Sequence, residues 1–256
     1  MPLRGRVALQ CFALGTLSAV AELASAAHPF ITDDTKTQGK GRFELELGTQ
    51  YTRASVDDVT LANFQFAPQL TYGTNDSLDL ILRPTYDINV ASGGASGRAA
   101  GFGDTNLEFK WRFWQQEQRS LAVKAGTGIP SGRFAQGLDS GQSTPRAYLL
   151  MGYSSESIGS YVNFGATRNI DDPVARQWLA HASAVVLWKL QERLQLGFDF
   201  AVDQNPVKAS SQWPAVALIG MIYSLSPSWD VDAGFQRGLN HSAPSNQFLL
   251  GATLRW

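Results

Sequence analysis

Apolar and polar residues alternate with a period of two along most of this 256-residue chain. The final segment shows the pattern most clearly. Its apolar positions are Phe248, Leu250, Ala252, Leu254 and Trp256, and between them stand Gln247, Gly251, Thr253 and Arg255. In a β-strand two such sets point to opposite faces. The segment is therefore predicted to be a strand with one apolar face and one face that is small or polar.

The same alternation recurs upstream and predicts about twelve strands, in keeping with the even number of strands in bacterial outer-membrane barrels. The expected strands begin at Phe43 and continue as Phe64–Tyr72, Leu78–Val90, Leu107–Phe113, Leu121–Ile129, Ala147–Tyr153, Val162–Ala166, Trp178–Leu190, Leu194–Val202, Pro214–Tyr223, Trp229–Phe235 and the C-terminal segment. Around Tyr148 and Ala217 both alternating sets contain apolar residues, so the sequence leaves the faces of those two strands ambiguous.

The lengths of the connections separate a barrel from a β-sandwich. Short connections such as Gly73–Asp76 and Gln191–Arg193 follow the even-numbered strands, whereas longer ones such as Ala91–Gly103 and Pro130–Pro145 follow the odd-numbered strands. Short periplasmic turns that alternate with longer external loops are typical of transmembrane barrels. The predicted fold class is therefore all-β, a single antiparallel transmembrane β-barrel that occupies residues 42–256.

The N-terminus has the pattern of a secretory signal peptide. Arg4 and Arg6 precede the apolar core Val7–Val20, and the small residues Ala24–Ala26 form a cleavage site. The core is shorter than the roughly 20 apolar residues that span a bilayer. Residues 1–26 are therefore predicted to be removed, and because Cys11 lies among them, the mature chain is expected to contain no cysteine.

Residues 27–41 lie between the signal peptide and the first strand and show no alternation. Their charged residues include Asp33, Asp34, Lys36 and Lys40. Two interpretations stay open from the sequence: a periplasmic tail without fixed structure, or a plug that folds into the barrel and pairs its charges with those of the inner face.

The charge balance, the histidines and the glycine-rich stretch Gly126–Gly132 argue against several classes of function. Without the signal peptide the chain has 21 − 2 = 19 basic and 22 − 1 = 21 acidic residues, which leaves no basic footprint for nucleic acid. The three histidines, His28, His181 and His241, have no partners at metal-ligand spacing. Gly126–Gly132 lacks the spacing of a nucleotide-binding loop. No catalytic, cofactor or metal site is predicted, although His181 and Ser183 share a face and keep a membrane hydrolase as a third hypothesis.

The polar faces of the strands carry the predicted functional residues. Inside a barrel they would line the lumen, as a bracing network or as a selective constriction. They are Glu44, Glu46, Asp79, Arg83, Asp87, Glu108, Lys110, Arg112, Lys124, His181, Lys189, Asp199 and Arg255. Aromatic residues near the predicted periplasmic strand ends are expected to form a girdle at the membrane interface. They are Tyr72, Phe113, Tyr153, Trp188 and Trp256.

Three stretches resemble a known family of barrels. They are Pro29–Gly41 (PFITDDTKTQGKG) leading into Phe43–Glu46, Gly101–Asp104 (GFGD) before the strand LEFK, and Gly128–Gly132 (GIPSG), in which Ser131 replaces a frequent threonine. The chain resembles the transporter-like outer-membrane proteins named for the meta-cleavage pathway of phenol degradation. This resemblance extends over nearly all of the mature chain, and it implies a role in the uptake of aromatic or other hydrophobic compounds.

The sequence thus favours a channel for passive uptake of small solutes, in the outer membrane of a Gram-negative-type bacterium. The expected partners are outer-membrane lipid, a small-molecule solute and, through the C-terminal strand, the barrel-insertion machinery; no nucleic-acid partner is expected. The alternative is a non-conducting structural or interaction barrel that acts through its external loops.

Overall fold

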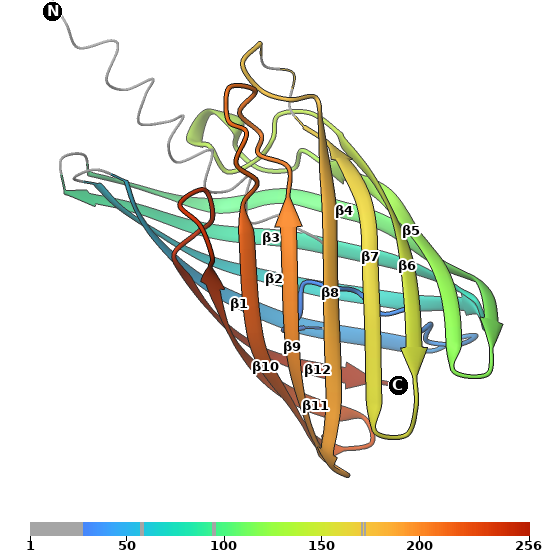
Figure 1. Cartoon of the computed structure of the whole chain (residues 1–256). Helices are drawn as coiled ribbons and strands as arrows, with labels where there is room; N and C mark the ends of the chain where they lie inside the picture. Colours follow the sequence, from blue (N-terminus) through green and yellow to red (C-terminus); the bar gives the residue numbers. More distant parts are fainter. Residues whose placement is uncertain (1–27, 57–58, 94–95, 170, 172) are drawn as a thin grey trace, which may run out of the picture.

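A single closed barrel makes up the described part of the protein. The computed structural model describes residues 28–56, 59–93, 96–169, 171 and 173–256, so the predicted signal peptide lies outside the described residues. Twelve antiparallel strands are present there (Figure 1). They are β1 (Phe43–Val56), β2 (Val59–Asn75), β3 (Leu78–Gly93), β4 (Gly97–Gln116), β5 (Arg119–Ile129), β6 (Thr144–Ser154), β7 (Ile158–Arg168), β8 (Trp178–Gln191), β9 (Leu194–Asp203), β10 (Ala215–Ser226), β11 (Trp229–Gly238) and β12 (Asn246–Arg255). A single-turn helix, η1 (Phe134–Gln136), follows β5. No helix in this part of the chain has the length and apolar character needed to span a membrane.

The barrel closes where the first strand meets the last. β1 pairs with β12 along ten residues of each, from Glu44 opposite Arg255 to Arg53 opposite Asn246. Beyond that ladder the Phe43 amide donates to the Trp256 carbonyl at 2.9 Å, the Trp256 amide donates back at 3.1 Å, and the two rings stack. Because every strand has two partners, the sheet has no open edge.

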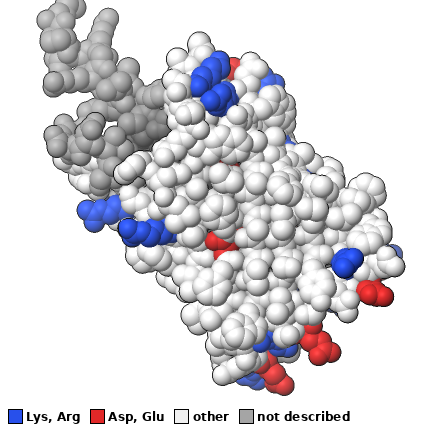
Figure 2. All heavy atoms as spheres, viewed as in Figure 1, with Lys and Arg blue, Asp and Glu red and all other residues white. Residues whose placement is uncertain are grey.

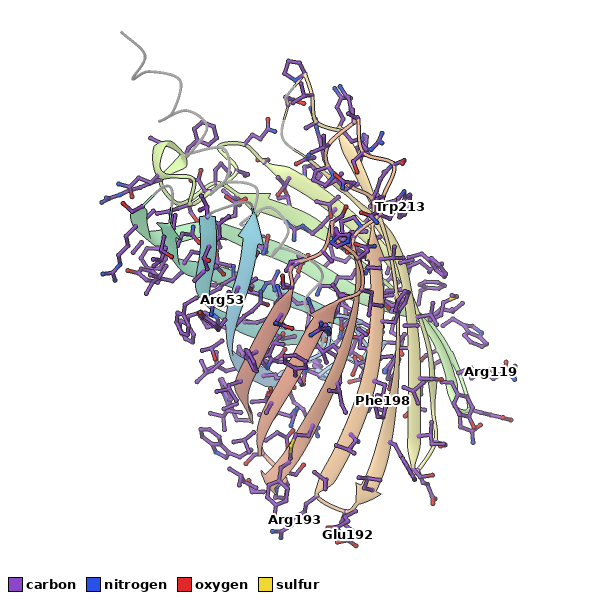
Figure 3. All side chains as sticks on the ribbon, turned by 60° about the vertical axis from the view of Figure 1, so that its left-hand side comes forward. Arg53, Arg119, Glu192, Arg193, Phe198 and Trp213 are labelled. Carbon is purple, nitrogen blue, oxygen red and sulfur yellow. The ribbon has the colours of Figure 1, made fainter. Side chains whose placement is uncertain are left out.

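The distribution of apolar and polar side chains is the reverse of that in a water-soluble protein. Outward-facing Leu250, Phe198 and Trp188 are 62%, 58% and 54% exposed, whereas the inward-facing polar residues Asp79 and Asn106 are fully buried. In Figure 2 most of the visible wall is uncharged, and its charged side chains gather mainly toward the two ends. In Figure 3 Phe198 lies on the outer wall, between the short β8–β9 turn and Trp213 near the opposite end. This arrangement, apolar outside and polar inside, confirms the predicted transmembrane barrel.

One predicted loop is wrong. The stretch Ala91–Gly103 is mostly strand, since β3 continues to Gly93 and β4 begins at Gly97, with Asp87 paired to Gly101. The sequence there is rich in glycine and alanine, so the two faces show no apolar contrast and the alternation disappears. The longer connections after β5, β7, β9 and β11 agree with the prediction.

The prolines inside strand patterns occupy irregular positions, where a missing backbone N–H is tolerated. Pro84 lies at the start of a register shift between β3 and β4, and Pro214 directly precedes β10. Pro68 lies where the ladder between β2 and β3 is interrupted, between Phe66 and Leu70. Pro84 therefore lies at a bulge and Pro214 at a strand end.

The outward-facing apolar band gives a stability prediction. Leu250 lies in the middle of β12 on the lipid side, so Leu250→Arg should destabilise the protein in liposomes by about 2–4 kcal/mol. Leu239 is also exposed but lies in an external connection, and Leu239→Arg is the matched control, expected to have little effect. Urea titration of the liposome-inserted protein measures both, and equal effects would contradict a membrane-embedded wall.

Candidate functional site

The segment before β1 runs through the interior of the barrel (Figure 1). Phe30, Thr32, Asp33 and Thr35 are buried there. Residues 28–38 bind side chains of β1, β3, β4, β5, β9 and β11, strands on all sides of the barrel. We refer to residues 28–41 as the inner segment.

Asp33 is the most strongly bound residue of the inner segment. Its carboxylate accepts from the ammonium groups of Lys124 at 2.8 Å and Lys110 at 3.4 Å, and Lys110 also contacts Asp34 at 3.3 Å. Burial alone would raise the pKa of Asp33, but the two ammonium groups outweigh it and hold that pKa below its ordinary value. The side-chain amide of Asn163, oriented with its oxygen toward the Asp33 N–H, accepts a hydrogen bond from that N–H and donates one to the Asp33 carbonyl.

Carboxylates of the wall bind the remaining polar groups of the inner segment. Asp199 accepts from the amides of Ile31 and Thr32, at 2.7 and 2.8 Å, and from the Thr32 hydroxyl at 2.6 Å. At the start of the segment the His28 amide donates to Glu46 at 3.1 Å and its imidazole pairs with Asp232. Farther along, the Gln38 amide contacts Asp79 at 3.2 Å, and its side chain donates to Glu44 at 2.7 Å. Hydrogen bonds to charged groups are the stronger kind, so this segment is held at several points along its length.

An apolar patch on the inner wall receives Phe30. Tyr161, Val185, Leu218 and Leu249 form one buried cluster with it. These residues face inward among polar neighbours, and the alternation of the sequence did not reveal them. Leu218 lies directly beside Ala217, and Tyr148 and Leu150 form a second inward cluster. Apolar residues on the inner face therefore explain why the sequence left the faces of these strands ambiguous.

Inward-facing glycines leave room for the inner segment. Gly48, Gly251, Gly234, Gly220 and Gly197 lie on β1, β12, β11, β10 and β9, and Gly48 pairs with Gly251 while Gly220 pairs with both Gly234 and Gly197. A Cβ at Gly220 would stand 2.8 Å from Pro29 Cγ and 2.9 Å from Phe30 Cε1, and one at Gly48 would stand 2.7 Å from the His28 ring. We call these five residues the glycine belt. Its clue in the sequence is a glycine at an inward position of each of these strands.

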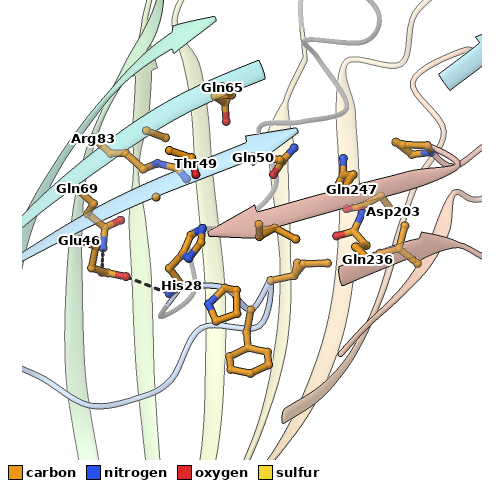
Figure 4. A pocket seen from close by; sticks show the side chains of 18 of the residues that line it. His28, Glu46, Thr49, Gln50, Gln65, Gln69, Arg83, Asp203, Gln236 and Gln247 are labelled. Carbon is orange, nitrogen blue, oxygen red and sulfur yellow. Dashed lines mark hydrogen bonds between the residues drawn. The ribbon is translucent and has the colours of Figure 1, made fainter. Parts of the chain in front are cut away.

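A cavity of ≈ 100 Å³ lies between the inner segment and the external end of the barrel (Figure 4). Residues 28–31 form one side of it, and Pro214 and Pro244, at the external ends, line it as well. Its polar lining includes Arg83 and the amides Gln50, Gln65, Gln69, Gln236 and Gln247. Its apolar lining includes Pro29, Phe30, Val216 and Leu249.

The predicted lumen residues separate into three groups. Those that contact the inner segment are Glu44, Glu46, Asp79, Lys110, Lys124 and Asp199. Those that face the interior elsewhere are Arg83, Asp87, Glu108 and His181. Those near the strand ends beside the short turns are Arg112, which donates to the Asp76 carbonyl, Arg255, which pairs with Glu44 and Asp230, and Lys189, which is exposed. Whether any of them contacts a solute stays a prediction.

The predicted girdle residues face outward beside the short turns. They are Tyr72, Phe113, Tyr153, Trp188 and Trp256, and all five are exposed. Their common position agrees with a membrane interface on that side, and the girdle itself stays a prediction.

His181 is hydrogen-bonded at both ring nitrogens. Nδ1 lies 2.7 Å from Asp203 and Nε2 lies 3.1 Å from Ser183. The distances are those of a nucleophile, a base and an orienting carboxylate. His181 and Ser183 are each 4% exposed, so the group is enclosed between the wall and its neighbours.

Sequence reasoning missed several inner residues. Arg146 is buried on β6, but the predicted strand began one residue later. Leu249 interrupts the polar set of the C-terminal strand and belongs to the Phe30 cluster.

Comparison with known proteins places this chain in a family. The family model described as "Putative MetA-pathway of phenol degradation" matches residues 26–256, so the chain belongs to that family. No curated protein matches the sequence.

Solved structures with a similar fold are outer-membrane barrels. An outer membrane channel from Pseudomonas putida F1 superposes with a TM-score of 0.72 at 13% identity, covering 87% of this chain and 98% of that one. The KdgM porin gives 0.50 at 8% identity, with 82% and 98% covered. The translocator domain of the autotransporter NalP from Neisseria meningitidis gives 0.50 at 8%, with 98% and 96% covered. At these identities the likeness establishes the fold.

The glycine belt gives a prediction for the inner segment. Gly220→Val should destabilise the full-length protein by about 1–3 kcal/mol, because the new side chain overlaps Pro29 and Phe30. The same change should have no effect in a chain that lacks residues 27–40. Gly165→Val is the control, because its Cβ would meet Tyr148 and Ala147 of the wall and should destabilise both chains. Urea midpoints measure the four cases; equal effects of Gly220→Val in both chains would refute the predicted overlap.

Proposed function

We propose that this protein is an outer-membrane channel through which small solutes cross passively, with the inner segment as its constriction. The cavity at the external end of the lumen carries the proposal, because a barrel that served only as a scaffold has no need of an internal space with polar walls. Charges and amides around a narrow passage select solutes by size and polarity.

The inner segment would limit the size of the passage. It crosses the lumen between opposite strands and is fixed by Asp33, Asp199 and the Phe30 cluster. A segment bound at so many points favours low conductance in the resting protein, and the solute would pass beside the segment or displace part of it.

Aromatic or other hydrophobic compounds are the solute class that we favour. The family description refers to phenol degradation, and the cavity offers apolar surface at Phe30, Val216 and Leu249 beside its polar lining. A ring with one polar substituent matches such a two-sided cavity, because pockets for small molecules combine apolar walls with a few polar groups.

Location and partners follow from the same proposal. Export through the N-terminal signal peptide would deliver the chain to the outer membrane of a Gram-negative-type bacterium. The exposed apolar band would contact lipid, and the C-terminal strand that ends in Trp256 would be recognised by the barrel-insertion machinery.

One observation favours the alternative, a non-conducting barrel that acts through its external loops. The loops after β7 and β9 are joined: Arg176 donates to the carbonyls of Asn205, Lys208 and Ser210 at 3.0–3.1 Å. A rigid pair of loops suits a binding surface. For His181 and Ser183 we propose a bracing role in the wall and no catalysis.

Planar-bilayer recording distinguishes these functions. We expect the purified full-length protein to give small, discrete conductance steps, and liposomes that contain it to release small solutes. Protein that never conducts and releases no solute would support the scaffold alternative. A hydrolytic activity abolished by His181→Ala would support the third hypothesis.

Removal of the inner segment tests the constriction. Deletion of residues 27–40 should raise the single-channel conductance, because the lumen loses the chain that crosses it. Barrel stability should be largely retained, since water can then solvate Lys110, Lys124 and Asp199. Heat-modifiable migration on gels serves as the control for folding, and unchanged conductance in a folded deletion variant would contradict the proposal.

A further inference from the structure

Arg83 differs from the other charged residues that line the cavity. Among the residues that the structure describes it makes no hydrogen bond and no ion pair, and its Nε is buried without a partner. The residue as a whole is half-buried, and a buried polar atom without a hydrogen-bond partner, such as this Nε, costs free energy. Such a group in the wall of a cavity indicates a ligand that completes its hydrogen bonds.

The carboxylates that line the cavity or interact with Arg83 are bound to other groups. Glu46 accepts from the His28 amide and from Gln69, and Asp203 accepts from His181. Glu108 lies in the electrostatic field of Arg83, but its ion pair is with Lys124 at 3.5 Å. None of these acids therefore takes the place of a counter-ion for the guanidinium.

Besides the acids Glu46 and Asp203, the cavity offers neutral donors and apolar surface. Gln236 and Gln247 lie opposite each other on β11 and β12, and neither side chain is hydrogen-bonded within the described protein. Pro29, Phe30 and Leu249 provide the apolar lining. In Figure 4 Arg83 and Gln69 lie at one end of the cavity, and Gln236 and Gln247 lie at the other.

We propose that this cavity binds a small monocarboxylate with an apolar body, its carboxylate on Arg83 and its apolar part against Pro29, Phe30 and Leu249. The guanidinium has the planar fork that matches a carboxylate. The space of ≈ 100 Å³ accommodates several water molecules, which a small organic acid would displace. This inference names the substrate class of the proposed channel and rests on that function for its biological role.

Binding of benzoate to the purified full-length protein in detergent tests the inference without any need for conduction. By calorimetry we expect saturable binding of benzoate to the wild type. Benzamide, which has nearly the same shape and no charge, should bind at least about tenfold more weakly. Inorganic phosphate, which lacks the apolar body, should also bind more weakly than benzoate.

Substitutions then assign the binding to Arg83. Arg83→Gln should weaken benzoate binding at least about tenfold and abolish the preference over benzamide, and Arg83→Lys should restore it in part, because it keeps the charge without the fork. Arg112→Gln is the matched control, since Arg112 lies beside the short turns, away from the cavity, and donates to the Asp76 carbonyl. Heat-modifiable migration verifies that each variant is folded.

Three results would overturn the inference: equal binding of benzoate and benzamide, benzoate binding that survives Arg83→Gln, or phosphate binding as tight as that of benzoate. Conductance measured separately distinguishes the two failures. A conducting wild type with no benzoate site would refute the inference alone, and a barrel that binds benzoate but never conducts would refute the channel and leave the site in place.

Discussion

The structure depends first on the satisfaction of backbone hydrogen bonds where no water is present. In the hydrocarbon layer each unpaired N–H or C=O costs several kcal/mol, so a sheet that crosses it must close. Here closure is made by β1 and β12 and is completed by the reciprocal bonds of Phe43 and Trp256. Once the sheet is closed, alternate residues must face lipid, and the remaining residues become the walls of an enclosed space. The period-two pattern of the sequence is the direct consequence.

The inner segment occupies part of that enclosed space. Charges on its wall are removed from bulk water and need partners, and the inner segment supplies them. Asp33 stands between Lys110 and Lys124, while the backbone of Ile31 and Thr32 satisfies Asp199. The same chain brings Phe30 to an apolar patch that would otherwise face water. The inner segment thus supplies the opposite charge, the hydrogen-bond donors and the apolar side chain that the inner face of the wall requires.

The sequence was sufficient for the barrel because lipid imposes a simple rule on the outer face. The sequence was insufficient wherever apolar residues lie on the inner face. Leu218 and Leu249 are apolar and face inward because Phe30 covers them, and a pattern of local alternation does not contain that contact. The strand residues within Ala91–Gly103 were predicted as a loop for a related reason, since glycine and alanine give neither face a signature.

In the candidate site, too, features set by neighbouring residues could be predicted, whereas contacts between residues far apart in the chain could not. Charged residues on the inner face were recognisable from their alternate positions along the strands, and most of the residues predicted to line the lumen do face the interior. Their roles were not recognisable, because partners such as Asp33 and Lys124 are 91 residues apart and meet only through the path of the inner segment. The sequence left that path open between a tail and a plug.

The two sides of the lumen have different physical characters. On one side Phe30 packs against Tyr161, Val185 and Leu218, and separating such a contact exposes a side chain whose burial contributes about 1.5–3 kcal/mol. On the other side, toward β1, β2 and β3, the cavity is lined by Gln50, Gln65, Gln69 and Arg83, where water or a solute can replace one hydrogen bond by another. Exchange of that kind has a small net cost. A solute that enters from outside would therefore meet less resistance along the polar wall. Beside the cavity, the glycine belt allows residues 28–30 to lie close against β9–β12 and β1.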